Sequence, residues 1–202
     1  MAEKSEKTFR YYKTFKPFGM LSQFSKEGNH STLADLDFTF PKDVYPIGRL
    51  DSDSEGLLLL TNDPRVNKLL LAPESKKKKV YWTQVEGEMS EDAMNGLRKG
   101  VEINLKGTVH RARAASVKGI PSPGIPEREP SVNYKKHSVT SWIEIVLTEG
   151  KNRQVRKMTA KVGHPTLRLI RYAIENISIE GMTSGQVSEL NHQEFYRKLN
   201  LK

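Results

Sequence analysis

The chain has 202 residues, of which 36% are hydrophobic and 28% are charged, and it carries a formal net charge of +9 and no cysteine. This composition is ordinary for a globular protein of one medium domain or two small lobes, and no apolar stretch approaches the ~20 residues that span a membrane. The lack of cysteine excludes a disulfide framework, a thiolate nucleophile and a cysteine-based metal site. The excess of Lys and Arg favours a polyanionic partner, with RNA or DNA ahead of an anionic membrane. Because residues 1–19 also lack the apolar core of a signal peptide, we expect a cytoplasmic protein.

The first half of the chain predicts short strands and one well-capped helix. Four consecutive leucines bounded by polar residues are typical of a core strand. Asp63 followed by Pro64 marks the start of a helix. In chain order, we expect two strands around a KPFG turn within residues 9–25, a helical turn at 31–36, a strand at 44–47, a buried strand at 57–60 and a helix at 65–71.

The second half predicts hairpins, two more helices and a long loop. Ser90 can cap a helix that Gly100 ends, and the proline-rich residues 118–137 show no periodicity, which indicates a functional or disordered loop. Without regular βαβ alternation, the fold class is α+β with a mixed, mostly antiparallel sheet and flanking helices. The expected elements are a strand at 80–86, a helix at 91–99, two strands within 101–117, the loop at 118–137, a strand at 142–147, a helix at 152–162, strands at 167–171 and 176–179, and a surface helix beyond residue 190.

An acidic loop at residues 48–56 lies directly before the leucine run. It holds Asp51, Asp53 and Glu55 together with Arg49. A carboxylate at the mouth of a core strand, two residues from a guanidinium, can serve as a nucleophile that stays ionised, because an adjacent cation lowers the pKa of an Asp. The same residue types build ordinary surface turns, so a purely polar turn is the competing interpretation.

Residues 149–171 carry most of the net positive charge. On the helix expected at 152–162, apolar residues at i, i+3, i+4 and i+7 share an inner face, and basic residues form a stripe beside it. Guanidinium groups fit phosphate oxygens, so the stripe predicts a phosphate-binding surface, with a solvated charged face as the alternative. The basic residues of this stretch are Lys151, Arg153, Arg156, Lys157, Lys161, Arg168 and Arg171.

The remaining motifs are less informative. Tyr81 could stack on a base, although an ordinary strand residue explains it as well, and the four lysines at residues 76–79 fit a solvated loop. The histidines are scattered without metal-ligand spacing, and no glycine-rich nucleotide cradle is present. We therefore expect no metal and no cofactor.

The acidic loop and the basic helix together resemble the motifs of a known family. Residues 48–63 contain GRLD followed by SEGLLLLTND, which resembles the signature of RNA pseudouridine synthases, in the branch that modifies bacterial ribosomal RNA. Further motifs match in the family's order: KPFG at 16–19, KVY at 79–81, RQVR at 153–156 and LIR at 169–171. The stretch KNRQVRKMTAKVGHPTLRLIRYA is most similar to the E-type members, which act on large-subunit ribosomal RNA.

This resemblance implies a pseudouridine synthase fold with a central RNA-binding cleft. A catalytic domain of two lobes that share one sheet would cover residues 14–190, between short tails at 1–13 and 191–202. Many relatives carry a small RNA-binding domain before the catalytic part, for which the first tail is too short. Substrate selection would then rest on the catalytic domain itself.

The resemblance also assigns roles in the isomerisation of a specific uridine to pseudouridine, which needs neither metal nor cofactor. After base flipping, Asp51 would act as the nucleophile and Arg156 would pair with it. Tyr81 would lie against the uracil, Leu169 would form an apolar wall, and Arg49 would lie near the vacated position in the RNA. The partner would be large-subunit ribosomal RNA or an assembling ribosomal particle, bound by a monomer. The other RNA-binding residues would be Arg153, Lys157 and Arg171.

Two other functions stay open on the sequence. A non-catalytic ribosomal-RNA-binding or ribosome-assembly factor of the same fold would bind RNA in a salt-sensitive way without changing a base. A carboxylate-dependent glycosidase would need two catalytic carboxyl groups about 5–10 Å apart, and the basic surroundings disfavour an uncharged sugar.

Overall fold

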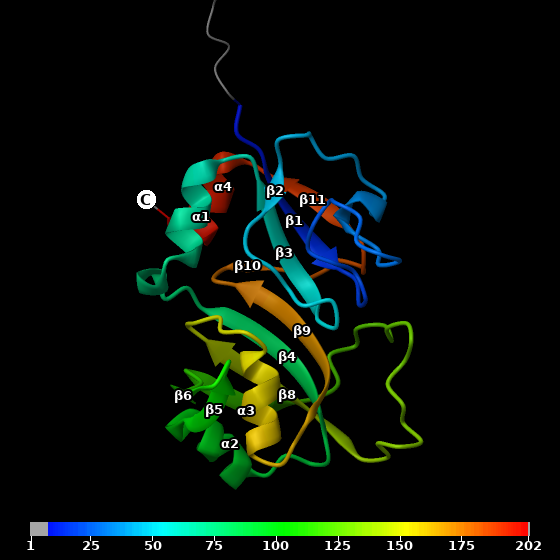
Figure 1. The fold of residues 1–202 in the computed structure, drawn as a ribbon, viewed down its shortest axis with the longest axis vertical. Helices are drawn as coiled ribbons and strands as arrows, with labels where there is room; N and C mark the ends of the chain where they lie inside the picture. The colour runs from blue at the N-terminus through cyan, green and yellow to red at the C-terminus, as the bar shows by residue number, and fades with distance from the viewer. Residues whose placement is uncertain (1–7, 202) are drawn as a thin grey trace, which may run out of the picture.

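One mixed β-sheet runs through the whole computed structural model, which describes residues 8–201 (Figure 1). Its strands are β1 Tyr11–Lys16, β2 Tyr45–Pro46, β3 Glu55–Thr61, β4 Lys79–Glu86, β7 Ser116–Ile120, β8 Thr140–Leu147, β9 Thr166–Ile174, β10 Ile177–Ser178 and β11 Val187–Leu190, and a separate hairpin pairs β5 Val101–Leu105 with β6 Thr108–Ala112. The order across the sheet is β11-β1-β3-β9-β4-β8-β7, with β2 beside β3 and β10 beside β9. Among these strands, all within residues 8–201, only the pairing of β3 with β9 is parallel. The predicted α+β class with a mostly antiparallel sheet is confirmed.

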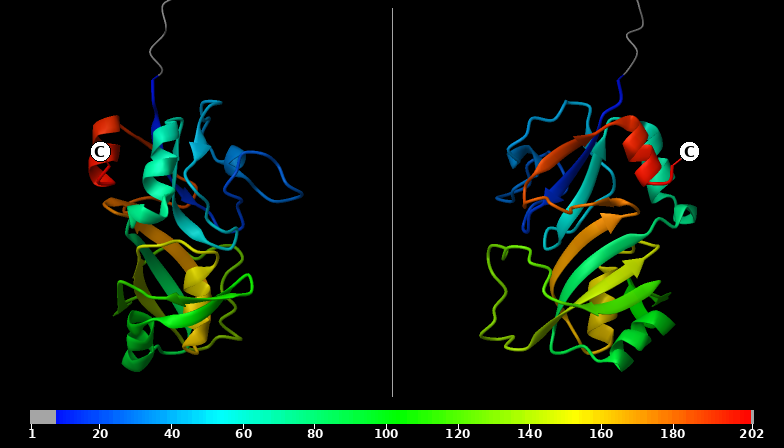
Figure 2. Two further views of the ribbon diagram at one scale, coloured as in Figure 1. Left: turned by 60° about the vertical axis from the view of Figure 1, so that its left-hand side comes forward. Right: turned by 180° about the vertical axis from the view of Figure 1, so that it is seen from behind.

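Helices flank this sheet at both ends. They are α1 Pro64–Leu71, α2 Glu91–Lys99, α3 Gln154–Lys161 and α4 His192–Lys198, with short 3-10 helices η1 Leu33–Asp35 and η2 Pro73–Ser75. The views of Figures 1 and 2 agree that α1 and α4 lie side by side, whereas α2 packs on β7, and α3 packs on β5 and β9. None of the helices between residues 8 and 201 combines the length and apolarity that crossing a bilayer requires.

Local capping signals explain where the helices begin and end. The side chain of Asp63 caps α1 by accepting the Arg65 backbone N–H, and Pro64 occupies the first helical position, where no N–H is needed. The Ser90 side chain caps α2, and Gly100, at φ +99°, ends it. These two helices have the predicted positions because their signals are local.

The sheet joins two halves of the molecule along a narrow seam, where β3 meets β9. β1, β3 and β11 form one half with α1 and α4, while β4, β7, β8 and β9 form the other with α2 and α3 (Figure 2). β3 and β9 meet through two register pairs, Glu55 with Ile170 and Gly56 with Arg171. Gly56 has φ +102°, and a Cβ there would lie 2.4 Å from the Arg171 carbonyl oxygen. Glycine fits this position because it tolerates positive φ and brings no side chain against the neighbouring strand.

The last helix belongs to the core and is not a peripheral tail. Phe195 of α4 and Leu199, which directly follows the helix, are fully buried, in a cluster that includes Leu57 of β3 and Val66 of α1. The prediction of a separate tail at residues 191–202 is corrected accordingly, because these apolar side chains complete the core of the first half.

The predicted N-terminal tail and hairpin also need correction. β1 begins at Tyr11, so the tail expected at residues 1–13 overlaps a strand of the sheet; its residues 1–7 lie outside the described residues. The chain after the KPFG turn forms only a single bridge, between Leu21 and Thr32, instead of a second strand. The sheet also contains β7 and β11, which the sequence did not predict. Between β7 and β8 the long loop projects from the second half (Figure 1).

Candidate active site

The acidic loop between β2 and β3 is fixed through its backbone. The Leu50 N–H donates to the Ser22 hydroxyl at 3.0 Å, and the same hydroxyl donates to the Leu50 carbonyl at 2.9 Å. From the KPFG turn, the Gly19 N–H donates to the Ser52 carbonyl at 2.7 Å. These contacts flank Asp51 on both sides, so its position is set by the backbone of the residues around it.

A buried lysine shapes the KPFG turn itself. The Lys16 side chain is fully buried, and its ammonium donates to the carbonyls of Pro17 and Met20, each at 2.8 Å. Burial lowers the pKa of Lys16 to about 8, while the carboxylate of Glu55 acts in the opposite direction. The turn that holds the acidic loop is therefore organised around a cation with little access to water.

Arg153 is the cation nearest to Asp51. The Asp51 side chain is 41% exposed, and its carboxylate Oδ2 lies 3.7 Å from Nη1 of Arg153. Arg153 also makes a bidentate contact with Asp53, at 3.1 and 2.8 Å. Because one guanidinium spans both carboxylates, it ties the start of α3 to the acidic loop.

Arg156, which we expected beside Asp51, contacts Asp53 instead. Its Nη2 donates to the Asp53 carbonyl at 2.6 Å, and its Nε lies 3.4 Å from the Asp53 carboxylate. Burial opposes ionisation of Asp53, but hydrogen bonds from Arg153 and the charge of Arg156 outweigh it and lower the pKa of Asp53. The pairing expected for Arg156 is thus corrected: it holds the loop and does not line the cavity beside Asp51.

A cavity of about 350 Å³ opens beside Asp51, bounded by the acidic loop, β4, β9 and the residues before α3. Tyr81, Leu169 and Arg171 all line it. They share one face of the sheet because Tyr81 and Arg171 are register partners and alternate residues of a strand point the same way. Tyr81 and Leu169 are 8% and 6% exposed, so the wall opposite Asp51 is apolar and fixed.

Arg171 has a free donor at the floor of this cavity. Its Nε donates to the Leu57 carbonyl at 2.8 Å, while its buried Nη2 has no partner in the described part of the chain. Burial lowers the pKa of Arg171 and raises the pKa of Tyr81, and each group partly offsets the shift of the other. An unpaired buried N–H costs free energy, so this group is ready to donate to a ligand oxygen.

Lys79 lines the cavity, although the sequence predicted a solvated loop at this position. It is the first residue of β4 and lines the cavity with Tyr81. Burial lowers its pKa, and the charge of Arg171 acts in the same direction. The available signal was strand alternation, because positions 79 and 81 of one strand share a face.

The other predicted site residues lie at the rim or away from the cavity. Arg49 is exposed at the rim and forms no ion pair with the residues described. Lys157 donates to the Asn104 carbonyl at 2.8 Å. Arg168 is 2% exposed and makes a bidentate pair with Glu55 on the other face of the sheet. Of the basic stripe predicted on the helix, Arg153 and Lys161 are exposed, whereas Arg156 and Lys157 are half-buried. Elsewhere in residues 149–171, Lys151 is exposed and Arg168 and Arg171 are buried.

The cavity offers a single carboxylate for chemistry at a carbon atom of a ligand bound beside it. Asp51 is the only acidic residue that lines the cavity within residues 8–201, whereas most glycosidases need a pair of carboxyl groups across the bond. The described side chains also include no group of three or more His, Asp or Glu residues that could hold a metal ion. The cavity presents a carboxylate, an apolar wall and, among the described residues, the unpaired Nη2 of Arg171.

Comparisons with known proteins point to one family. A family model described as RNA pseudouridylate synthase matches residues 11–161. The chain is 45% identical over 175 residues to a protein of Vibrio parahaemolyticus named ribosomal large subunit pseudouridine synthase E, covering 87% of this chain and 71% of that protein. A protein of the same name from Xanthomonas axonopodis is 44% identical over 168 residues, covering 83% of this chain and 86% of that protein. A solved structure described as a pseudouridylate synthase has a TM-score of 0.73 and 22% identity, covering 95% of this chain and 74% of its own, which supports the fold.

Proposed function

This chain belongs to the RNA pseudouridylate synthase family, and we propose that its substrate is a uridine of large-subunit ribosomal RNA, which it converts to pseudouridine. Membership makes it an RNA-modifying isomerase. The choice of ribosomal RNA rests on relatives at 43–45% identity whose names specify the ribosomal large subunit. The proposed partner is free ribosomal RNA or an assembling particle, bound by a monomer.

The reaction exchanges one bond to the ribose for another. The N1–C1′ bond breaks, the uracil turns within the site, and C5 bonds to C1′; C5 then loses its proton and N1 gains one. Positive charge develops on the sugar as the first bond breaks, and a carboxylate can either attack C1′ or stabilise this charge. We assign this role to Asp51, the carboxylate at the mouth of the cavity.

The observation that carries the proposal is the placement of Asp51 at the open side of a small cavity with a fixed apolar wall. Its carboxylate is partly exposed and lies 3.7 Å from Nη1 of Arg153. Tyr81 and Leu169 would hold the uracil between them while it turns. The free Nη2 of Arg171 would donate to a uracil carbonyl oxygen.

Access to this cavity requires that the uridine leave its stack. A base cannot reach a recessed carboxylate from within a helix, so the enzyme would bind a flipped nucleotide, at a cost of a few kcal/mol. Contacts to phosphates from Arg49, Lys151 and Arg153 would offset that cost, because all three are exposed and line the cavity. Arg156 and Lys157 are half-buried and already bonded to Asp53 and Asn104, and they would support this surface without touching RNA.

The test compares Asp51→Asn with Asp37→Asn, an exposed aspartate that does not line the cavity. The assay follows tritium released from C5 of [5-³H]uridine in a large-subunit ribosomal RNA transcript, and nucleoside chromatography identifies pseudouridine. We expect Asp51→Asn to lose at least about 10³-fold in turnover, as is typical when a nucleophile is removed. Its dissociation constant for RNA should change by less than about fivefold, because an exposed ion pair contributes little to binding.

Two results would contradict this proposal. If Asp51→Asn keeps near-normal turnover, Asp51 does not carry the chemistry. If the unaltered protein binds the transcript with salt-sensitive affinity but releases no tritium, its substrate lies outside large-subunit ribosomal RNA.

A further inference from the structure

A second and larger cavity lies behind the sheet. Its volume is about 590 Å³, within the range of roughly 300–1,000 Å³ typical of ligand pockets. Trp82 and Tyr172 line it, and they directly follow Tyr81 and Arg171 of the first cavity. Since neighbouring residues of a strand point to opposite faces, the two cavities lie back to back across β4 and β9.

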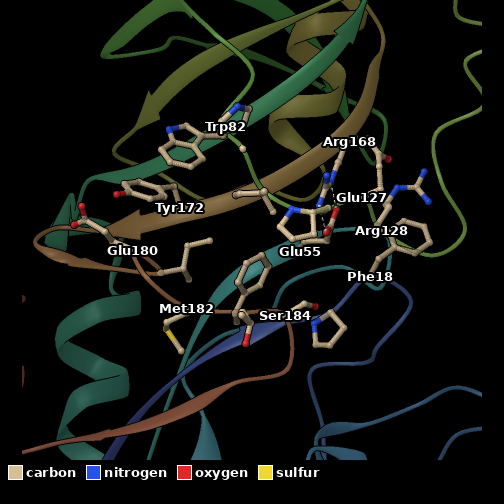
Figure 3. Close-up of a pocket in the computed structure, with 18 of the residues that line it drawn as sticks. Phe18, Glu55, Trp82, Glu127, Arg128, Arg168, Tyr172, Glu180, Met182 and Ser184 are labelled. Carbon is tan, nitrogen blue, oxygen red and sulfur yellow. Dashed lines mark hydrogen bonds and ion pairs between the residues drawn. The ribbon is translucent and has the colours of Figure 1, made fainter.

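The walls of this cavity are mostly aromatic and apolar, and they come from segments far apart in the chain. The rings of Trp82 and Tyr172 are stacked, with centroids 3.8 Å apart. The long loop closes one side, and it is held to β9 by Arg168, whose Nη2 donates to the Pro126 carbonyl at 2.9 Å. Figure 3 shows Phe18 and Arg128 at one end, Trp82, Tyr172 and Glu180 at the other, and Glu55 with Arg168 between them.

One end of the cavity already holds a guanidinium on an aromatic ring. The Cζ of Arg128 lies 3.9 Å from the centroid of the Phe18 ring, a cation–π contact. At the other end, no cation of residues 8–201 lies over the aromatic pair. Trp82 donates from Nε1 to Glu144 at 3.1 Å, and the Glu144 carboxylate also pairs with Lys118.

Glu180 supplies an unpaired negative charge at that second end. It lies beside Tyr172 in Figure 3 and forms no ion pair with any described residue. Burial raises the pKa of the Tyr172 phenol, and the carboxylates of Glu180 and Glu144 raise it further. Glu180 and Glu144 therefore place negative charge near the aromatic pair, with Lys13 and Lys118 as counter-charges.

The charge of the whole cavity runs against that of the protein. Four acidic and two basic residues line it, although the chain as a whole carries +9. The buried pair of Glu55 and Arg168 is internally neutral, which leaves Glu127, Glu129 and Glu180 against Arg128. A phosphate backbone would be repelled from such a rim, whereas a cation would be attracted.

We propose that the end of this cavity formed by Trp82, Tyr172 and Glu180 binds an arginine side chain of an extended segment of a partner protein. A guanidinium can stack on an aromatic face and donate to a carboxylate at the same time. Its aliphatic stem would pack along the apolar wall near Met182. This site is separate from the catalytic cavity and does not depend on the identity of the RNA substrate.

The test uses the full chain and a fluorescein-labelled nonapeptide of glycine, serine and alanine with two central arginines. A matched peptide carries citrulline, which is neutral and nearly isosteric, at both arginine positions. Fluorescence anisotropy measures binding to the unaltered protein, to Glu180→Lys, and to Glu88→Lys. Glu88 is exposed and lines neither cavity, so this control has the same change in net charge.

We expect the arginine peptide to bind the unaltered protein and the Glu88→Lys variant alike, and Glu180→Lys to weaken binding by about fivefold or more. The citrulline peptide should bind at least about fivefold more weakly than the arginine peptide. In a Trp142→Phe background, which leaves Trp82 as the only tryptophan, binding should change the tryptophan emission.

Three outcomes would overturn the proposal. Equal binding of the arginine and citrulline peptides would exclude a cation site. Equal effects of Glu180→Lys and Glu88→Lys would place the peptide elsewhere on the surface. Displacement of the peptide by a short RNA, with tighter RNA binding by Glu180→Lys than by Glu88→Lys, would make the cavity an RNA site instead.

Discussion

Gly56→Ala should destabilise the protein more than any other substitution of glycine by alanine at a similar backbone angle. A Cβ at this position would lie 2.4 Å from the carbonyl oxygen of Arg171 and 2.8 Å from its nitrogen, whereas ordinary contacts begin at 3.4 Å. The strands β3 and β9 would have to separate by about 1 Å at the two register pairs that join the halves. The alanine side chain would therefore disturb the pairing of β3 with β9 that joins the two halves.

The size of the effect can be worked out against a matched control. Gly107 has φ +89° and nothing within 4 Å of its Cβ position, so Gly107→Ala reports the backbone strain alone, about 1–3 kcal/mol. Gly56→Ala adds overpacking of about 1–3 kcal/mol and weakened ladder hydrogen bonds of about 1 kcal/mol each. We expect an excess of about 2–4 kcal/mol over the control, which corresponds to roughly 10 °C in Tm for a chain of this size.

Urea denaturation and thermal unfolding of both variants provide the measurement. Because Arg171 lies in the displaced segment, Gly56→Ala should also reduce pseudouridine formation at temperatures where it is still folded, while Gly107→Ala should not. Equal losses of stability in the two variants would refute the reasoning, since they would mean that the close approach to β9 costs nothing.

Two further predictions concern buried charges. Glu55 and Arg168 form an ion pair that is only 2–3% exposed, so Glu55→Leu or Arg168→Met alone leaves a buried charge without its partner. Urea denaturation should show that each single variant loses about 3–5 kcal/mol in free energy of unfolding and that the double variant loses less than either. Additive losses would contradict this prediction. The pKa of Lys16 is about 8 in the folded chain, against an ordinary value of 10.5. Between these pH values the unfolded chain therefore binds more protons than the folded chain, so the contribution of Lys16 to the free energy of unfolding rises with pH. The stability of the unaltered protein minus that of Lys16→Met should accordingly increase from pH 8 to pH 10.5, and a difference that stays flat would exclude the assigned shift.

The parts of the fold that were predictable are those with local causes. Asp63 with Pro64, and Ser90 with Gly100, start or end helices through contacts within a few residues. The chain after the KPFG turn was predicted as a strand because it is aromatic, yet the turn that precedes it is bonded, through the Gly19 N–H, to Ser52 in a distant loop. Such a partner, thirty-odd residues away, has no signature in the local pattern.

The site shows the same division between local and distant causes. The motif placed Asp51 at the mouth of a core strand, where the structure has it. Arg153 was counted as part of the helical stripe, but it precedes α3 as a cap residue at φ +52°, which turns its side chain toward the acidic loop. Arg168 and Arg171 were grouped as one basic surface, although a spacing of three residues on a strand places them on opposite faces.

The ion pairs between the acidic loop and Arg153 join residues about one hundred positions apart. During translation, the nascent chain therefore displays the whole aspartate-bearing loop while the segment that supplies its cations has yet to be synthesised. A chain that ends before this segment has Arg49 but lacks Arg153, Arg171 and the complete cavity. The chain would thus become able to hold a nucleotide only late in folding, after a long chain loop has closed. Contacts between residues this far apart in the chain slow folding.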